Sequence, residues 1–242
     1  MTLDQTAPND LLLARLQQCS RPELIELLND LKLNKDKHAH AEERDLQELV
    51  GNELRSVAGY SLGNFFGKKQ RLTYRQILIR VADKLTPGIW SKSPYREDNT
   101  GDGEDLIENY ISERVRTLAE AQFKKLPPEQ RAEVQKQVLA QLRQKGVPSH
   151  VLQGVGSTLA AGTLGGAVSA SVIAQLLFGG FWTWLFGLSA GQLVLGGLAG
   201  GGPLGLALAG AVIANSPGYQ KLIPAVVRLI AITHSQRIMA TM

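Results

Sequence analysis

The most informative property of the sequence is an absence of charge. The 75 residues from 146 to 220 contain no Asp, Glu, Lys or Arg, although the chain of 242 residues carries 26 basic and 22 acidic side chains. The same stretch holds 18 of the 25 glycines. A folded domain in water needs charged side chains over most of its surface. Residues 146–220 are therefore expected to be covered, either by protein or by lipid.

Acidic residues are also missing from the C-terminal part of the chain. All 22 acidic side chains and 23 of the basic ones lie in residues 1–145, and residues 221–242 add only Lys221, Arg228 and Arg237. The net charge of +4 and the pI of about 9.2 therefore come mainly from a basic tail beside an apolar region. A basic stripe interleaved with aromatic residues is absent, so nucleic-acid binding is not expected.

Residues that carry chemistry are scarce. Cys19 is the sole cysteine, which excludes an intramolecular disulfide and disfavours a thiolate metal site. His38 and His40 have too few partners in the sequence for a metal site. The segment 67–69 (Gly-Lys-Lys) lacks the earlier glycine and the following Ser or Thr of a phosphate-binding loop. No triad motif is found, so we predict a protein that is not an enzyme and has no metal or cofactor.

Helical periodicity recurs through residues 1–145, without the sustained polar–apolar alternation of strands. Ser20 and Glu23 form a capping box, and Thr73 caps a helix that is predicted to end at Leu85. Three further helices are predicted at 42–57, with an end at Gly59, at 104–125 and at 128–145, together with polar loops at 34–40 and 87–104.

These features predict an all-α fold. It comprises an N-terminal helical bundle (1–145), a glycine-rich apolar helical hairpin (146–218) and a basic apolar C-terminal helix (219–242). The N-terminus lacks a basic segment followed by an apolar core, so no secretory signal is expected and the bundle is assigned to the cytoplasm.

Small residues recur at every fourth position in the charge-free region. On a helix they lie along one face and let a second backbone approach closely, which is how helices associate in lipid. Each glycine costs a helix in water roughly 1 kcal/mol relative to alanine, so the repeat requires a compensating contact. A tightly packed hairpin in a soluble protein is the open alternative. The predicted helix-packing residues are Gly154, Thr158, Gly162, Gly166, Ala170, Ala174, Gly197, Gly201, Gly205 and Ala209.

The charge-free region is long enough for two membrane spans, near 167–188 and 193–213, because about 20 apolar residues cross a bilayer. The turn between them, residues 187–191, carries no charge that insertion would have to move through hydrocarbon. Trp182 and Trp184 lie just before this turn, where an aromatic belt would place them. A buried aromatic cluster is the alternative interpretation.

The C-terminal helix has two interpretations. Lys221, Arg228 and Arg237 on an otherwise apolar helix suit a lipid interface with anionic headgroups. Equally, the helix suits the core of the bundle, with Arg228 paired to an acid from residues 1–145.

Three segments resemble the bacterial YaaW-type protein family. They are Leu16-Gln-Gln-Cys-Ser-Arg-Pro-Glu-Leu24, the pair Gly59-Tyr-Ser-Leu-Gly-Asn64 and Tyr74–Val81, and Gly202-Pro-Leu-Gly205 with Tyr219 and Ile223-Pro-Ala-Val226. The middle of that family is sometimes labelled as resembling a ubiquinol–cytochrome c chaperone. The resemblance implies no catalytic residue.

The sequence thus predicts a non-enzymatic, membrane-associated bacterial protein, cytoplasmic with inner-membrane association. A glycine-zipper hairpin would insert in the membrane for its remodelling or for assembly, and the protein would form homo-oligomers. Two alternatives remain: a soluble, chaperone-like assembly factor that binds an apolar protein partner, and a toxin-like pore former whose hairpin is sheathed in water.

Overall fold

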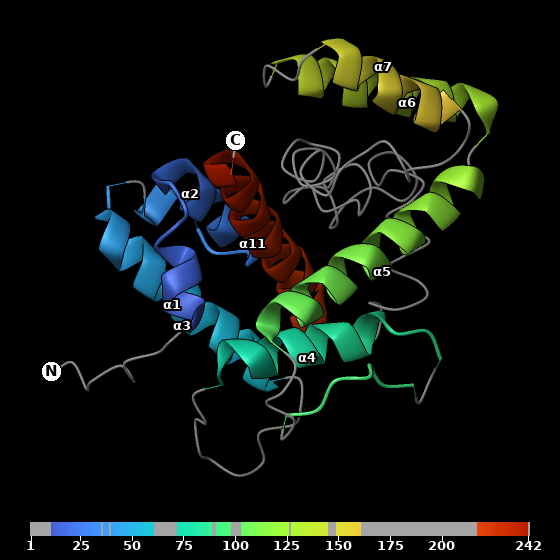
Figure 1. The fold of residues 1–242 in the computed structure, drawn as a ribbon. Helices are drawn as coiled ribbons and strands as arrows, with labels where there is room; N and C mark the ends of the chain where they lie inside the picture. Colours follow the sequence, from blue (N-terminus) through green and yellow to red (C-terminus); the bar gives the residue numbers. More distant parts are fainter. Residues whose placement is uncertain are drawn as a thin grey trace, which may run out of the picture. The chain divides into compact units, whose positions relative to one another are not determined.

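The computed structural model describes residues 11–34, 36–38, 40–60, 72–88, 91–97, 103–125, 127–144, 149–160 and 217–241. Within these ranges the chain is α-helical with no strand, which confirms the predicted all-α fold (Figure 1). The elements are α1 (Leu11–Leu16), α2 (Arg21–Asp30), the 3-10 helix η1 (Asp36–His38), α3 (Glu43–Tyr60), α4 (Tyr74–Leu85), α5 (Glu104–Lys125), α6 (Pro128–Gln144), α7 (Ser149–Ala160) and α11 (Pro217–Thr241).

The capping box predicted at Ser20 is present, and Thr73 caps α4 as predicted, there too in a capping box. The Ser20 backbone N–H donates to the Glu23 carboxylate at 2.7 Å before α2. Before α4, the Gln76 backbone N–H donates to Thr73 Oγ1 at 3.2 Å, and the Thr73 N–H donates to Gln76 Oε1 at 3.0 Å. These reciprocal bonds satisfy donors that a helix N-terminus leaves without partners.

The predicted end of α3 at Gly59 is wrong, because the helix continues to Tyr60. A single glycine costs a helix only about 1 kcal/mol, which packing of the other residues outweighs. α11 in the same way continues through a residue that disfavours helices, Pro224.

The chain forms two compact units. The first comprises residues 1–111 and 216–233, and the second comprises residues 112–215 and 234–242. The first unit is therefore discontinuous in sequence, since α11 completes it after an excursion of the chain. The sequence-based division places a boundary after residue 145, whereas the first part of the first unit ends at residue 111.

The core of the first unit consists of side chains from α1 to α5 and from α11. The fully buried large residues include Tyr74, Leu12, Leu16, Leu24, Leu27, Leu28, Leu31, Leu46, Leu54, Ile77 and Leu78. Their spacing follows the helical period, which is what places them on one face of each helix.

Candidate functional site

The C-terminal helix α11 belongs to the first unit from its start to Thr233. Figure 1 shows it (red) lying alongside α2. Its middle is buried almost without interruption, with relative exposures between 0% and 6%. The buried residues are Leu222, Ile223, Ala225, Val226, Val227, Arg228, Leu229, Ile230, Ala231, Ile232 and Thr233.

An ion pair joins α11 to α2 across almost the whole sequence. Arg228 Nε donates to Asp30 Oδ2 at 2.5 Å, and Arg228 Nη2 donates to Asp30 Oδ1 at 3.1 Å. The side chains are only 6% and 12% exposed. Burial raises the pKa of Asp30, and the hydrogen bond and charge of Arg228 act in the opposite direction. Glu26 lies one turn away on α2, 3.9 Å from Arg228.

The first turn of α11 is held by two other helices. A Cβ on Gly218 would lie 3.4 Å from the backbone oxygen of Val57 in α3, so the two backbones approach closely there. The Lys84 ammonium of α4 lies 5.5 Å from the centre of the Tyr219 ring, within reach of a cation–π interaction. Contacts with α2, α3 and α4 thus hold α11 at its first turn and at Arg228.

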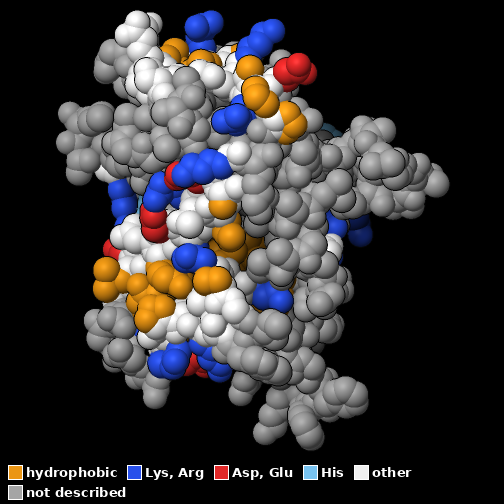
Figure 2. Space-filling view, turned by 90° about the vertical axis from the view of Figure 1, so that its right-hand side faces the viewer, with side chains coloured by type: hydrophobic (Ala, Val, Ile, Leu, Met, Phe, Trp, Pro, Cys, Tyr) orange, Lys and Arg blue, Asp and Glu red, His pale blue; other side chains and the backbone are white. Residues whose placement is uncertain are grey.

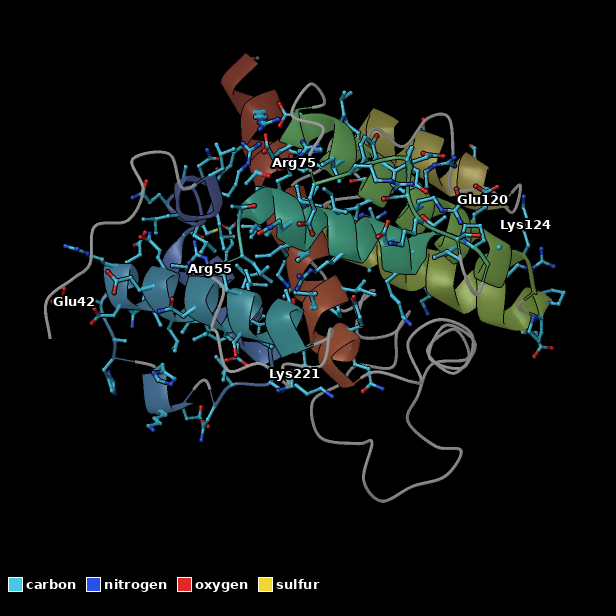
Figure 3. All side chains as sticks on the ribbon, turned by 90° about the horizontal axis from the view of Figure 1, so that it is seen from below. Glu42, Arg55, Arg75, Glu120, Lys124 and Lys221 are labelled. Carbon is cyan, nitrogen blue, oxygen red and sulfur yellow. The ribbon has the colours of Figure 1, made fainter. Side chains whose placement is uncertain are left out.

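Of the residues predicted at a lipid interface, Arg228 is buried, with its guanidinium against Asp30. This is the pairing that the alternative of a core helix with an acidic partner predicted. The apolar residues around it are likewise taken up by the bundle. Lys221, labelled in Figure 3, and Arg237 are partly exposed.

Several other arginines of the first unit bind backbone carbonyl groups. Arg21 Nη1 donates to Ala41 O at 2.6 Å, and Arg80 Nη1 donates to Ala58 O at 2.6 Å near the end of α3. Arg55, labelled in Figure 3, donates to Leu72 O at 3.2 Å. These bonds satisfy carbonyl groups at helix ends and in loops. On the described part of the face in Figure 2, basic side chains are interspersed with hydrophobic and acidic ones.

A second buried polar cluster links α1, α4 and α5. Glu108 is fully buried; its Oε1 accepts from Tyr74 Oη at 2.9 Å and lies 3.2 Å from Arg15 Nη2. The same Arg15 nitrogen is 2.8 Å from Asp105 Oδ1. The contacts of Glu108 thus join α5 to α1 and α4.

Cys19 is also buried, and its Sγ lies 3.6 Å from the backbone oxygen of Arg15. Desolvation, followed by the charges of Glu23 and Glu43, raises the pKa of the thiol to about 12. A thiol with so little thiolate at neutral pH is a poor nucleophile. In the described ranges, no group of three or more His, Cys, Asp and Glu side chains is placed to hold a metal ion.

The predicted glycine zipper is described only at its beginning, in α7. The glycine seen at a helix contact is Gly156, which lies outside the predicted line of small residues. Its backbone oxygen accepts from Gln135 Nε2 at 2.9 Å, and a Cβ at this position would lie 3.6 Å from Leu139 of α6. Gly154 is partly exposed, and Thr158 is part of the same helix. Outside the described residues lie Gly162, Gly166, Ala170, Ala174, Trp182, Trp184, Gly197, Gly201, Gly205 and Ala209.

Comparisons with protein families, with curated proteins and with solved structures find no match to this chain. The resemblance to YaaW-type proteins therefore stays a prediction. Among the helices that the structure describes, none combines the length and the apolar character needed to cross a bilayer.

Proposed function

We propose that the protein is a non-enzymatic, membrane-associated helical protein whose charge-free region, residues 146–218, is its lipid-contacting element. The first unit would be the aqueous domain that carries this element. The observation that supports the proposal most strongly is the separation of charge: the described helices of the first unit bear charged side chains, while 75 consecutive residues bear none.

The discontinuity of the first unit adds support. The chain leaves this unit after residue 111 and returns to it at residue 216, so residues 146–215 of the charge-free region lie within an excursion from one folded body. An excursion that starts and ends in the same body suits a hairpin, which enters a bilayer and comes back on the same side. In this proposal the partly exposed Lys221 of α11, and not Arg228, would be the cation available to anionic headgroups.

Fractionation of cells that express the full chain tests the proposal. We expect the protein to sediment with the inner membrane and to resist extraction with alkaline carbonate. A protein that remains in the soluble fraction, or that carbonate releases, would instead favour the soluble chaperone-like alternative.

A pair of substitutions tests the role of the small residues. Gly162→Leu with Gly166→Leu should prevent close helix approach and reduce the oligomer size in mild detergent. The control is Ala161→Leu with Gly165→Leu, which has the same spacing but falls on a different face of a helix. Equal oligomer sizes for the wild type and both variants would contradict the zipper.

A further inference from the structure

The first unit needs the last helix of the chain to complete its core. Gly218, Tyr219 and Arg228 of α11 contact α3, α4 and α2, and the residues from Leu222 to Thr233 are almost all buried. Roughly a hundred residues separate the two parts of this unit, so chain connectivity alone restrains α11 only weakly. Noncovalent contacts must bring it back.

The side chains that α11 buries are mostly apolar and do not specify one register of the helix. The Asp30–Arg228 pair does, because an arginine in the middle of a buried apolar helix is tolerated only where an acid meets it. A displacement of α11 by one residue along its axis would rotate Arg228 away from Asp30 and bury the guanidinium among leucines and isoleucines. Such a pair adds specificity more than stability.

We propose that α11 is a clasp that returns the chain to the first unit, with the Asp30–Arg228 pair selecting its register. The clasp holds both ends of the intervening segment in one folded body. If the charge-free region enters a membrane, which is the proposed function above, the clasp makes it cross an even number of times. Residues 1–111 and the C-terminal helix then lie on the same side.

The clasp is tested first on the purified full-length protein by limited proteolysis. Arg228→Asp places an acid against Asp30 and should speed cleavage within α11 by roughly a hundredfold, since it breaks a buried pair. The matched control is Lys221→Asp, a partly exposed basic residue of the same helix and the same unit, which should change the rate little. Asp30→Arg combined with Arg228→Asp restores opposite charges and should recover most of the protection.

Hydrogen exchange on the wild type gives a second measurement that does not depend on a variant folding. Amides of α11 between Leu222 and Thr233 should be as protected as those of α4, because both belong to one cooperative core. Protection of α11 well below that of α4 would overturn the clasp, as would a proteolysis rate that Arg228→Asp leaves unchanged.

The topological consequence is tested separately in a Cys19→Ser background. Single cysteines at Gln17, which is exposed in the first unit, and at Thr241, at the end of α11, are treated with a membrane-impermeant thiol reagent in spheroplasts. Both should be labelled only after the membrane is opened. Labelling of position 241 alone in intact spheroplasts would overturn the same-side arrangement. A protein found wholly in the soluble fraction would contradict the proposed function. Proteolysis and hydrogen exchange would still decide whether α11 is a clasp.

Discussion

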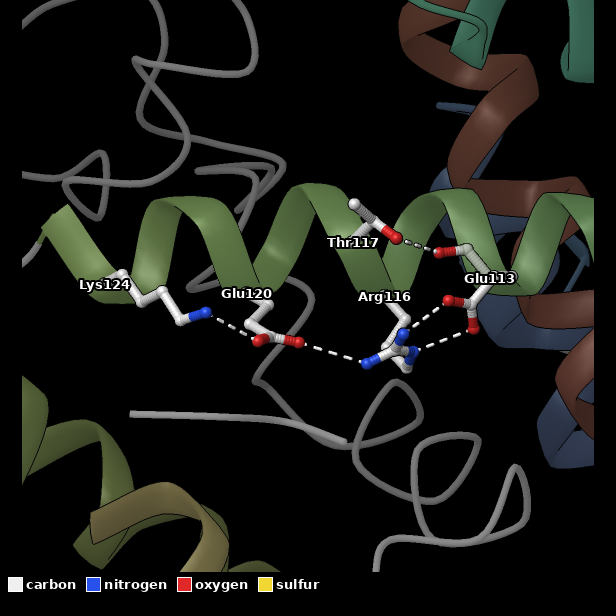
Figure 4. Close-up of polar contacts among 5 residues, drawn as sticks. All are labelled: Glu113, Arg116, Thr117, Glu120 and Lys124. Atoms are coloured by element: carbon white, nitrogen blue, oxygen red, sulfur yellow. Dashed lines mark hydrogen bonds and ion pairs between the residues drawn. The ribbon is translucent and has the colours of Figure 1, made fainter. Parts of the chain in front are cut away.

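The described polar contacts of the two units differ in their reach along the chain. In the first, the helices bury long runs of apolar side chains, and residues distant in sequence meet, as Asp30 and Arg228 do. In the second, Gln135 of α6 donates to the Gly156 oxygen of α7, only 21 residues away. Its α5 segment carries a ladder of ion pairs between neighbouring turns (Figure 4).

Helix α5 illustrates the difference within a single element. Its N-terminal half contributes the buried residues Ile107, Glu108 and Ile111 to the first unit. Its C-terminal half presents Arg116 between Glu113 and Glu120, with Lys124 following on Glu120 at 2.8 Å. The described contacts of the first half reach Arg15 of α1 and Tyr74 of α4, whereas the ion pairs of the second half lie within α5.

The largest expected effect concerns the apolar core supplied by α11. Leu229→Ala removes a fully buried side chain and should lower the free energy of unfolding by about 2–5 kcal/mol, through lost transfer energy and the cavity left behind. The control Leu106→Ala, at a site 51% exposed, should change it by less than about 0.5 kcal/mol. Denaturant titration followed by circular dichroism measures both. Similar losses for the two variants would show that α11 is not part of the core.

Next in size is the buried charge at Glu108. Glu108→Gln keeps the shape of the side chain but removes the charge that faces Arg15, and should cost about 1–3 kcal/mol. Because the pair is shielded from solvent, 1 M salt should leave most of this loss in place. A loss that disappears in salt would mean that the cluster is open to water and that α1, α4 and α5 are less tightly joined than in the structure.

The sequence was sufficient for features whose cause is local. Capping at Ser20 and Thr73 and the bounds of α4 and α5 follow from residues within a few positions of one another. It was insufficient for contacts between distant residues. An arginine in an apolar helix indicates an acidic partner, but 22 acids were available and nothing local distinguishes Asp30 from the others. The choice between lipid interface and core for α11 depended on that partner.

A smaller effect is expected at the capping box of α4. Thr73→Ala removes the acceptor for the Gln76 backbone N–H and should cost about 1 kcal/mol. Thr73→Ser retains a hydroxyl acceptor and should restore most of the stability. Thermal unfolding compares the three proteins. If the alanine and serine variants are equally destabilised, the methyl group of Thr73 matters more than its hydrogen bond.

The smallest effect is expected in the ion-pair ladder of the second unit, which tests whether local pairs contribute there. The hydrogen bond from Arg116 lowers the pKa of Glu113 below its ordinary value of 4.5, against an opposing effect of burial. A lowered folded-state pKa means that the carboxylate stabilises the helix above the ordinary value, and that this contribution is lost as pH falls through the folded-state pKa. Because the Glu113 side chain is 58% exposed, its contribution should not exceed about 0.5 kcal/mol.

Glu113→Gln should therefore raise the hydrogen-exchange rate of α5 amides around Arg116 about twofold at neutral pH. When the pH falls well below the lowered pKa of Glu113, the wild-type side chain is neutral, as glutamine is. The stability difference between the two proteins should therefore vanish in acid thermal melts. At neutral pH, 1 M salt should also remove it, in contrast to Glu108→Gln. A difference that persists in both acid and salt would show that Glu113 acts through packing and not through its ion pair with Arg116.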